Sequence, residues 1–358
     1  MKRAIRFLFV MTIVTLLAAC AAPPAAAPTS APAPTNPPAN TEVPPTAAPP
    51  TEAPMRVALI LPGRADDQSW NQAAAAAMNW AKDNAGFPVE LTVVEQVYNV
   101  ADIEPALRDY AQQGYDLVIG HGFQFQEPII KVAGDFPDVH FALGTGFKLA
   151  PNVGVYDVKL EQGAYLMGIL AGMMTKSNVI GVTGGVDVSE IHRGHVAFTM
   201  AAEKVDPSAK VINTFIGDFN DLTKAKEAAL NQVSAGADIL WQSGDGVGIA
   251  VMGACAEKNV LCMGNNFDQN PLAPKNSLAS VVYNWGPLYV QMMQEIKSGT
   301  FGNKQYWIDF SNTGIQIVWN DALKSTVPQA TVDAMNAAQQ EFMAGTLDLG
   351  DLDNAKLP

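Results

Sequence analysis

Aromatic, amide and carboxylate side chains occur together in the segment "DDQSWNQ", where a loop is expected to become a helix. Trp70 offers a flat ring that can stack on a planar ligand, and Asp67 and Asn71 offer polar atoms for the ligand's edge. Ser69 is also typical of a helix N-cap, and acidic side chains favour the positive end of a helix. We expect both roles at this turn: it begins a helix, and Asp67, Ser69, Trp70 and Asn71 bind a ligand.

Comparable side chains recur in later loops. The segment "HGFQFQ" contains Phe123, which is expected in the wall of a cleft or in packing. Further candidate ligand-binding residues come from the segments "SGDG", "NNFD" and "YNW", and they are Gly244, Asp245, Asn266, Asp268, Tyr283 and Trp285. These loops are rich in Asp, Asn, Gly and aromatic residues and poor in Lys and Arg. Their composition favours an uncharged, planar, polar ligand. A phosphate is less favoured, because phosphate sites usually contain Lys or Arg.

The sequence gives little support for a dinucleotide-binding, metal or catalytic site. The turn "SGDGVG" lacks the G-x-G-x-x-G spacing of a dinucleotide-binding loop, so we interpret it as a tight turn whose backbone amides approach a ligand. His192 and His195 have a spacing seen in metal sites, but no third ligand accompanies them, and we expect solvated or polar cleft side chains. No arrangement of nucleophile, base and acid is recognisable. We therefore expect no metal, no cofactor and no enzymatic activity.

The elements that position these loops follow from a repeated pattern. From residue 56 onward, ten short apolar runs alternate with glycine-bearing loops and helical stretches. Such runs, without polar alternation, are typical of parallel strands covered by helices on both faces. The pattern restarts near residues 175–178, so we expect two doubly wound α/β domains, and an eight-stranded barrel fits less well. Because ligands bind beyond the carboxyl ends of such strands, the candidate loops would line one interdomain cleft.

The N-terminal 54 residues predict export and anchoring. Residues 1–20 combine three cations, a short apolar run and the ending "LAAC", which resembles a bacterial lipobox; we expect a signal peptide whose removal leaves Cys20 acylated. Residues 21–54 hold 12 of the 24 prolines and only two charged residues, so we expect a disordered linker. At ~3.1 Å per residue it would span on the order of 100 Å. The mature protein would lie on the extracytoplasmic face of the cell membrane, held by lipid alone.

The net charge limits the partners that the protein can bind, and the cysteine content limits its disulfides. Removing residues 1–20 takes away three positive charges, which changes the net charge from −13 to −16. Such an acidic body argues against binding to nucleic acid or to an anionic membrane surface. After Cys20, only Cys255 and Cys262 remain, on a predicted helix and the following strand. We expect buried thiols there, although the spacing leaves a disulfide open.

Six segments in order resemble the basic membrane protein family: "DDQSWNQA", "YDLVIGHGF", "FPDVHFAL", "EQGAYLMGILAGMMTKSNVIGVTGG", "GADILWQSGDGVG" and "LASVVYNWGP". The similarity extends over roughly residues 55–300. These lipoproteins are substrate-binding components of ABC importers, related to the purine-nucleoside receptor. The resemblance implies a type I periplasmic-binding fold with a hinge and a purine base or nucleoside as ligand. By position, Trp70 takes the place of the family's first stacking ring, with Asp67 and Asn71 as its polar neighbours.

Three departures concern the ligand. Asn266 stands where nucleoside binders have a ribose-contacting Asp, with Asp268 two residues later. Tyr283 replaces a Lys, and the "NWGP" that follows is more similar to the nucleobase-binding branch. Gly194 occupies the place of a second stacking Phe. These departures make a bare base at least as plausible a ligand as a nucleoside.

The combined expectation is an importer's binding protein that closes two domains on a small ligand and then docks to a membrane permease. We expect the domains to comprise residues 55–175 plus about 285–305, and residues 176–284 plus about 306–358. A sensor that uses the same fold to feed a signalling partner, or a binder of another small polar ligand, remains the alternative.

Overall fold

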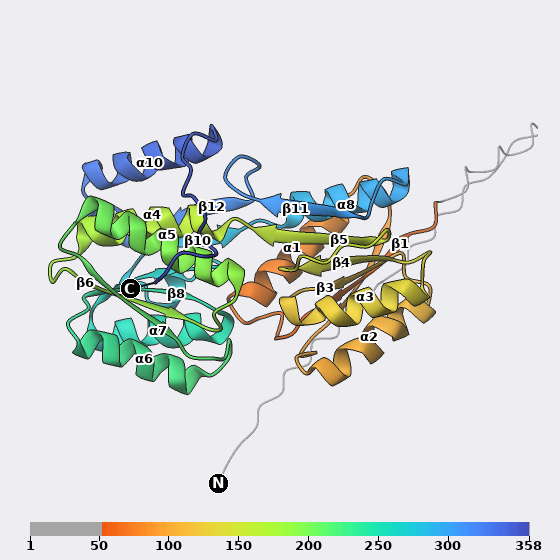
Figure 1. The fold of residues 1–358 in the computed structure, drawn as a ribbon, viewed down its shortest axis with the longest axis horizontal. Helices are drawn as coiled ribbons and strands as arrows, with labels where there is room; N and C mark the ends of the chain where they lie inside the picture. The colour runs from red at the N-terminus through yellow and green to blue at the C-terminus, as the bar shows by residue number, and fades with distance from the viewer. Residues whose placement is uncertain (1–51, 358) are drawn as a thin grey trace, which may run out of the picture. The chain divides into compact units, whose positions relative to one another are not determined.

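The structure is a computed structural model that describes residues 52–357. The signal peptide, Cys20 and the linker up to residue 51 lie outside the described residues, so the predictions for them stay predictions. Residues 55–352 contain two parallel-type sheets of six strands, each covered by helices on both faces (Figure 1). We call each sheet with its helices a lobe.

The first lobe is built on a sheet in the order β11-β5-β4-β3-β1-β2, in which every pairing is parallel. Helices α1 and α8 pack together on one face, and α2 and α3 pack together on the other. Its elements are β1 Met55–Ile60, α1 Trp70–Asn84, β2 Val89–Val94, α2 Val100–Gln112, β3 Leu117–Gly120, α3 Gln126–Asp135, β4 His140–Gly144, β5 Val153–Val158, α8 Gly286–Ser298 and β11 Lys304–Ile308.

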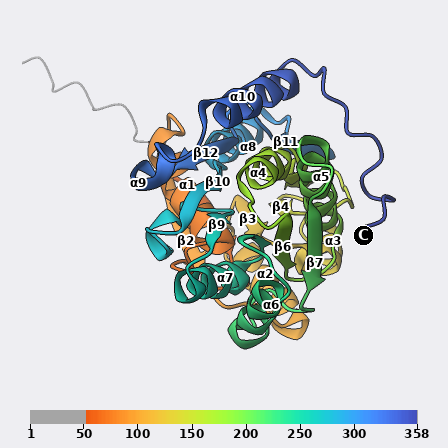
Figure 2. The same ribbon diagram turned by 90° about the vertical axis from the view of Figure 1, so that its left-hand side faces the viewer.

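The second lobe repeats this arrangement with the order β12-β10-β9-β8-β6-β7, in which only β12 is antiparallel to its neighbour. Helices α4 and α5 cover one face together with α10, and α6 and α7 cover the other (Figure 2). Its elements are α4 Leu160–Met174, β6 Val179–Gly184, α5 Ser189–Val205, β7 Lys210–Phe215, α6 Leu222–Ser234, β8 Ile239–Ser243, α7 Asp245–Lys258, β9 Leu261–Gly264, β10 Ser277–Tyr283, β12 Ile315–Trp319, α9 Asp321–Lys324 and α10 Gln329–Met343.

The chain passes between the lobes three times. It leaves the first sheet after β5, returns after β10, and leaves again after β11. Strands β3, β5 and β8 are buried along their whole length, because helices cover both faces of each sheet. This confirms the predicted doubly wound α/β fold, with β11 and β12 as strands additional to the ten expected. The exact division of the chain into domains stays a prediction.

Candidate ligand-binding site

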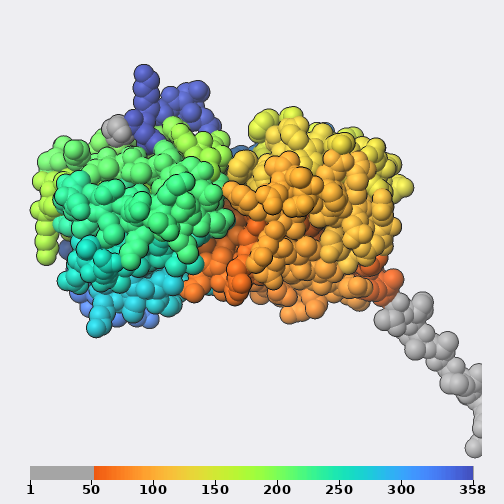
Figure 3. Space-filling view, turned by 90° about the horizontal axis from the view of Figure 1, so that it is seen from below, coloured from red at the N-terminus to blue at the C-terminus, as the bar shows by residue number. Residues whose placement is uncertain are grey.

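A cavity lies where the carboxyl ends of the two sheets face each other. The space between its lining side chains is about 490 Å³, counting the part open to solvent. The lobes meet along the boundary between the orange-yellow and green-cyan halves in Figure 3. The lining residues are Pro62, Trp70, Tyr98, Gly122, Phe123, Gln124, Thr145, Val188, Glu190, Ile191, Phe219, Gly244, Asp245 and Asn266.

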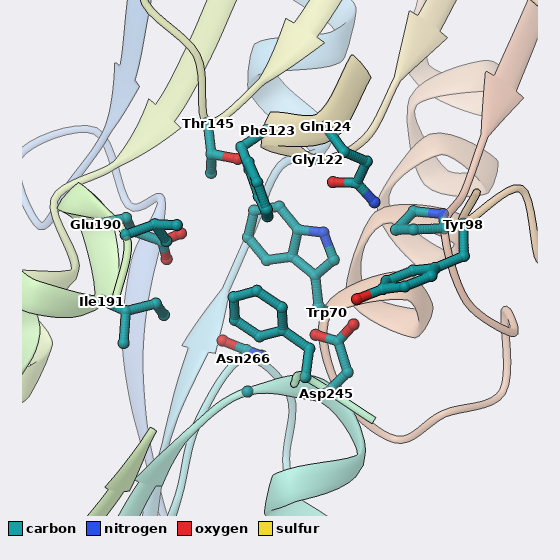
Figure 4. A pocket seen from close by; sticks show the side chains of 14 residues that line it. Trp70, Tyr98, Gly122, Phe123, Gln124, Thr145, Glu190, Ile191, Asp245 and Asn266 are labelled. Carbon is teal, nitrogen blue, oxygen red and sulfur yellow. The ribbon is translucent and has the colours of Figure 1, made fainter. Parts of the chain in front are cut away.

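Trp70, the first residue of α1, is fixed by other aromatic groups. Its ring stacks on His121 at a centroid distance of 4.1 Å, and its Nε1 donates a hydrogen bond to the His121 carbonyl at 3.2 Å. The rings of Tyr283 and Trp285 pack edge-on against it. Because the indole N–H is already bonded, Trp70 offers the cavity an apolar ring surface and no donor (Figure 4).

His121 supports that ring as a neutral imidazole. The side chain is fully buried, and burial lowers its pKa to about 3. Its Nδ1 lies 2.6 Å from the Tyr156 hydroxyl, and its Nε2 lies 3.3 Å from the Trp70 carbonyl. His121 therefore positions Trp70 from behind and does not line the cavity.

The turn before α1 is organised by Asp67. Its carboxylate accepts hydrogen bonds from the backbone amides of Ser69, Asn71 and Gln72 at 2.9, 3.1 and 2.9 Å, and from the Asn71 side chain at 2.7 Å. Ser69 occupies the N-cap position but makes no side-chain capping bond. The acidic residue thus takes the capping role, and the Ser69 hydroxyl is left for another contact.

That contact joins the lobes. Ser69 Oγ donates a hydrogen bond to the Gly244 carbonyl at 3.2 Å and accepts one from Asn266 Nδ2 at 2.9 Å. The Asn71 amide lies 3.4 Å from the Asp245 carboxyl. The N-terminal end of α1 is therefore a direct bridge between the lobes at the edge of the cavity.

The second lobe contributes two buried carboxyl groups to the cavity. Asp245 begins α7, and Glu190 lies in the first turn of α5. Burial raises the pKa of each of them well above the usual range. Asn266 lies beside them in a turn with φ of 71°, a left-handed conformation that asparagine tolerates better than most residues.

Two phenylalanine rings approach each other from opposite lobes. Phe123 of the first lobe and Phe219 of the second have centroids 6.2 Å apart. Gly194, which was expected in the place of a stacking ring, lies within α5, where an added side chain would meet Leu160. The loop between β7 and α6, and not α5, thus supplies the second-lobe ring of this cavity.

The structure brings together five of the eleven predicted ligand-binding residues as cavity lining: Trp70, Phe123, Gly244, Asp245 and Asn266. Ser69 and Asn71 lie in the junction between the lobes, and Tyr283 and Trp285 lie behind Trp70. Asp67 borders a wider opening beside the cavity, and Asp268 accepts a hydrogen bond from the Asn270 backbone at 3.1 Å. These placements leave the ligand roles themselves untested.

Sequence reasoning did not single out several lining residues. Gln124, Thr145, Glu190, Ile191 and Phe219 follow strand ends, as the other candidate residues do, and Tyr98 follows β2. Their position after strands was a usable signal. Their side chains did not stand out, because single residues in polar loops carry no periodic pattern.

The wider opening next to the cavity is acidic. It is bordered by Asp66, Asp67, Asp218 and Asp221, and its one lining cation among the described residues, Arg64, pairs with Asp66 at 2.7 Å. The cavity itself is lined by no Lys or Arg within residues 52–357. The electrostatic environment therefore disfavours an anionic ligand.

The histidine and cysteine pairs lie away from the cavity lining. His195 is buried with its ring nitrogens near Asn213 and Ser243, and His192 contacts Asp187 and Ala355. Cys255 and Cys262 are buried free thiols. Within residues 52–357, no helix is long and apolar enough to cross a membrane.

Two doubly wound lobes with a cavity at their facing strand ends define a substrate-binding protein of the type I periplasmic-binding fold. Residues 55–352 match the family described as ABC transporter substrate-binding proteins, PnrA-like (Bmp), and the chain belongs to that family. It is thus a binding protein and not an enzyme, as predicted.

Three comparisons illustrate the relationship. A purine-binding protein of Brucella abortus is 30% identical over 256 residues, covering 72% of this chain and 73% of the relative. A Haloferax volcanii protein provisionally named as an ABC transporter glucose-binding protein is 27% identical, covering 76% and 70%. The structure of an ABC transporter solute-binding protein from Conexibacter woesei superposes with a TM-score of 0.69 and 27% identity, covering 83% and 99%.

Proposed function

We propose that this protein captures a purine base or nucleoside in the cavity between its lobes and delivers it to an ABC permease. The observation that carries this proposal is the ring of Trp70, which lines the cavity and stacks on His121 on its other side. Phe123 and Phe219 line the same cavity, and within residues 52–357 no Lys or Arg does. Such rings suit a flat heterocycle, and carboxyl and amide groups suit its polar edge. The name of the Brucella relative supports the same ligand class.

In this proposal, the ligand contacts Trp70, Phe123, Gly244, Asp245 and Asn266. The remaining predicted residues support the site by shaping the turn before α1, the bridge between the lobes or the packing behind Trp70. Ligand binding would stabilise the closed arrangement in proportion to its preference for that state.

A sugar is the second candidate ligand, because a ring stacked on Trp70 and acceptors such as Asp245 also suit a hexose, and one relative's name points to glucose. Calorimetry of the mature chain distinguishes the candidates. We expect dissociation constants well below millimolar for at least one purine base or nucleoside. Binding of D-glucose with all purines weaker than about millimolar would overturn the purine proposal.

The proposed location is the extracytoplasmic face of the cell membrane, through a lipid on Cys20. We predict that Cys20→Ser leaves the protein without a fatty-acyl group, so that it appears in the soluble fraction. Mass spectrometry of the mature N-terminus and fractionation of cells measure this directly. An unchanged membrane fraction would show that something else holds the protein there.

Co-purification with a permease, as opposed to a signalling partner, separates the importer from the sensor alternative.

A further inference from the structure

Glu190 is a buried carboxyl group without a partner. It is 8% exposed and lines the cavity, yet no residue within 52–357 donates a hydrogen bond to its side chain. In the close-up it lies across the cavity from Tyr98, on the second-lobe side (Figure 4). Its oxygens are not among the fully buried side-chain atoms without a partner in residues 52–357, so they keep accessible surface, and Glu190 lines the cavity.

The nearby guanidinium group of Arg193 does not serve as the partner of Glu190. Arg193, three residues further along α5, directs its guanidinium to Glu161 at 3.3 Å, Asp353 at 3.6 Å and Asp157 at 3.7 Å. No ion pair of 4.0 Å or less joins Arg193 to Glu190. The positive charge is thus shared among three other carboxylates.

A second carboxyl group in the cavity is almost as poorly paired. Asp245 has one contact, a long 3.4 Å approach from the Asn71 amide. Glu190 and Asp245 come from the N-terminal turns of two different helices, α5 and α7, and both line the cavity that Trp70 enters from the first lobe. Their unused oxygens can accept hydrogen bonds only from a bound molecule or from solvent.

We infer that Glu190, assisted by Asp245, selects ligands whose ring edge presents an amino group, and rejects rings that present carbonyl oxygens or negative charge at that edge. This inference rests on the proposed function in placing the ligand in this cavity. It goes further in naming the amino-bearing heterocycles as the preferred class. A site built around unpaired acceptors discriminates strongly against an analogue that lacks the matching donor.

Proton linkage supplies an independent readout. Groups that face Glu190 are Asp157 of β5, Glu161 of α4, Arg193 of α5, Asp245 of α7 and Tyr283 of β10. Burial first, and then repulsion from the neighbouring carboxylates, raises the pKa of Glu190, and Arg193 offsets this only in part. A ligand that donates hydrogen bonds to the ionised form therefore releases protons as it binds, and its affinity rises with pH.

The test is calorimetry of the mature chain with pairs of rings of which one bears an amino group and the other does not. The pairs are adenine and hypoxanthine, 2-aminopurine and purine, and cytosine and uracil, each in two buffers of different ionisation enthalpy. We expect the amino-bearing ring of a pair to bind at least about tenfold more tightly, with proton release. Glu190→Gln should weaken its binding about 10- to 100-fold and reduce the proton release, with a smaller change for Asp245→Asn. Glu203→Gln, an exposed change on the same helix, serves as the charge-matched control.

Stability measurements guard against misfolding of the variant. A carboxyl group with a raised pKa stabilises the fold below its unfolded pKa and loses that contribution as pH rises through the folded pKa. A glutamine side chain does not ionise, so the variant does not lose stability in this way as pH rises. Relative to the native chain, Glu190→Gln should therefore gain stability between pH 5 and pH 8 while it loses affinity.

The outcomes separate the two proposals. Purine binding that is indifferent to the amino group and to Glu190→Gln, or stronger for the carbonyl-bearing ring, overturns the inference alone. Cytosine binding that depends on Glu190, with no purine bound, overturns the proposed function and supports the inference. If no amino-bearing ring binds, both are overturned.

Discussion

At the scale of single residues, the site depends on side chains that are fixed by their neighbours before any ligand arrives. Trp70 has its indole N–H bonded to the His121 carbonyl and its edges against Tyr283 and Trp285. Only the ring surface remains available, so its contribution to binding is stacking. Such preorganisation reduces the entropy lost on binding.

Truncation of this ring should affect both binding and stability. We predict that Trp70→Ala weakens purine binding by about 1–3 kcal/mol, the range for loss of base–aromatic stacking. Because the ring is buried, it should also lower the free energy of unfolding by about 3–5 kcal/mol. Calorimetry and denaturant unfolding measure the two effects. Trp70→Phe, which keeps a ring surface, should retain most of the binding. Unchanged affinity in a folded Trp70→Ala variant would assign Trp70 to packing alone.

At the scale of elements, α5 carries Glu190 and Ile191 to the cavity, and the C-terminal segment holds that end of the helix. Ser189 Oγ donates a hydrogen bond to the Asp353 carboxylate at 2.5 Å, and His192 Nε2 lies 2.8 Å from the Ala355 carbonyl. Leu352 of this segment is itself buried. In Figure 2 the segment descends from α10 past α5. The end of the chain therefore supports a helix that lines the cavity.

This attachment should depend on pH through His192. Partial burial by itself lowers the pKa of His192, but its hydrogen bonds to the Ala355 carbonyl and to Asp187 outweigh that effect and raise it. The protonated ring donates through both nitrogens, whereas the neutral ring can donate through only one. Since the folded pKa is raised, the contribution is complete below about pH 6.5 and is lost as pH rises through the folded pKa.

We predict that amide hydrogens of residues 351–357 exchange several-fold faster at pH 8.5 than at pH 6, after correction for intrinsic rates. Hydrogen-exchange mass spectrometry measures this. His192→Gln should remove most of the pH dependence, and the termini of α2 should show none in either protein. Equal protection at both pH values would argue that Leu352 alone holds the segment.

At the scale of the whole molecule, the lobes are joined by hydrogen bonds from one turn. Ser69 bonds to both Gly244 and Asn266 across the junction, and Gln269 Nε2 donates to the Gln68 carbonyl at 3.0 Å. These contacts depend on the arrangement of the lobes, because each pairs a first-lobe atom with a second-lobe atom. They therefore stabilise the arrangement of the lobes in this structure and not the individual lobes.

Removal of the Ser69 hydroxyl should favour opening. We predict that Ser69→Ala weakens ligand binding by about 0.5–1.5 kcal/mol for each of the two hydrogen bonds lost, with little change in the stability of either lobe. Small-angle scattering should show a larger radius of gyration without ligand, which returns toward the native value at saturation. Ser325→Ala, an exposed serine on the second lobe, is the matched control. An unaltered radius and affinity would mean that other contacts set the closure.

Much of the fold was predictable because its strands are continuous apolar runs. The strands β11 and β12 were not predicted, because each is only five residues long and carries polar residues at or near its start, such as Lys304 and Gln316, which leaves only a short apolar run. The capping role at α1 was predicted for Ser69, whereas Asp67 takes it, since one carboxylate can accept several backbone amides.

The amino-acid sequence by itself determined the two doubly wound lobes and the loops that follow their strands, because apolar periodicity and glycine-bearing turns are local properties. Only the tertiary structure decided which side chains of those loops enter the cavity. It placed Phe219 opposite Phe123, turned Tyr283 and Trp285 behind Trp70, and left Glu190 unpaired. The physical reason is that a side chain's partner depends on how separate loops approach in space, and no local pattern records that approach.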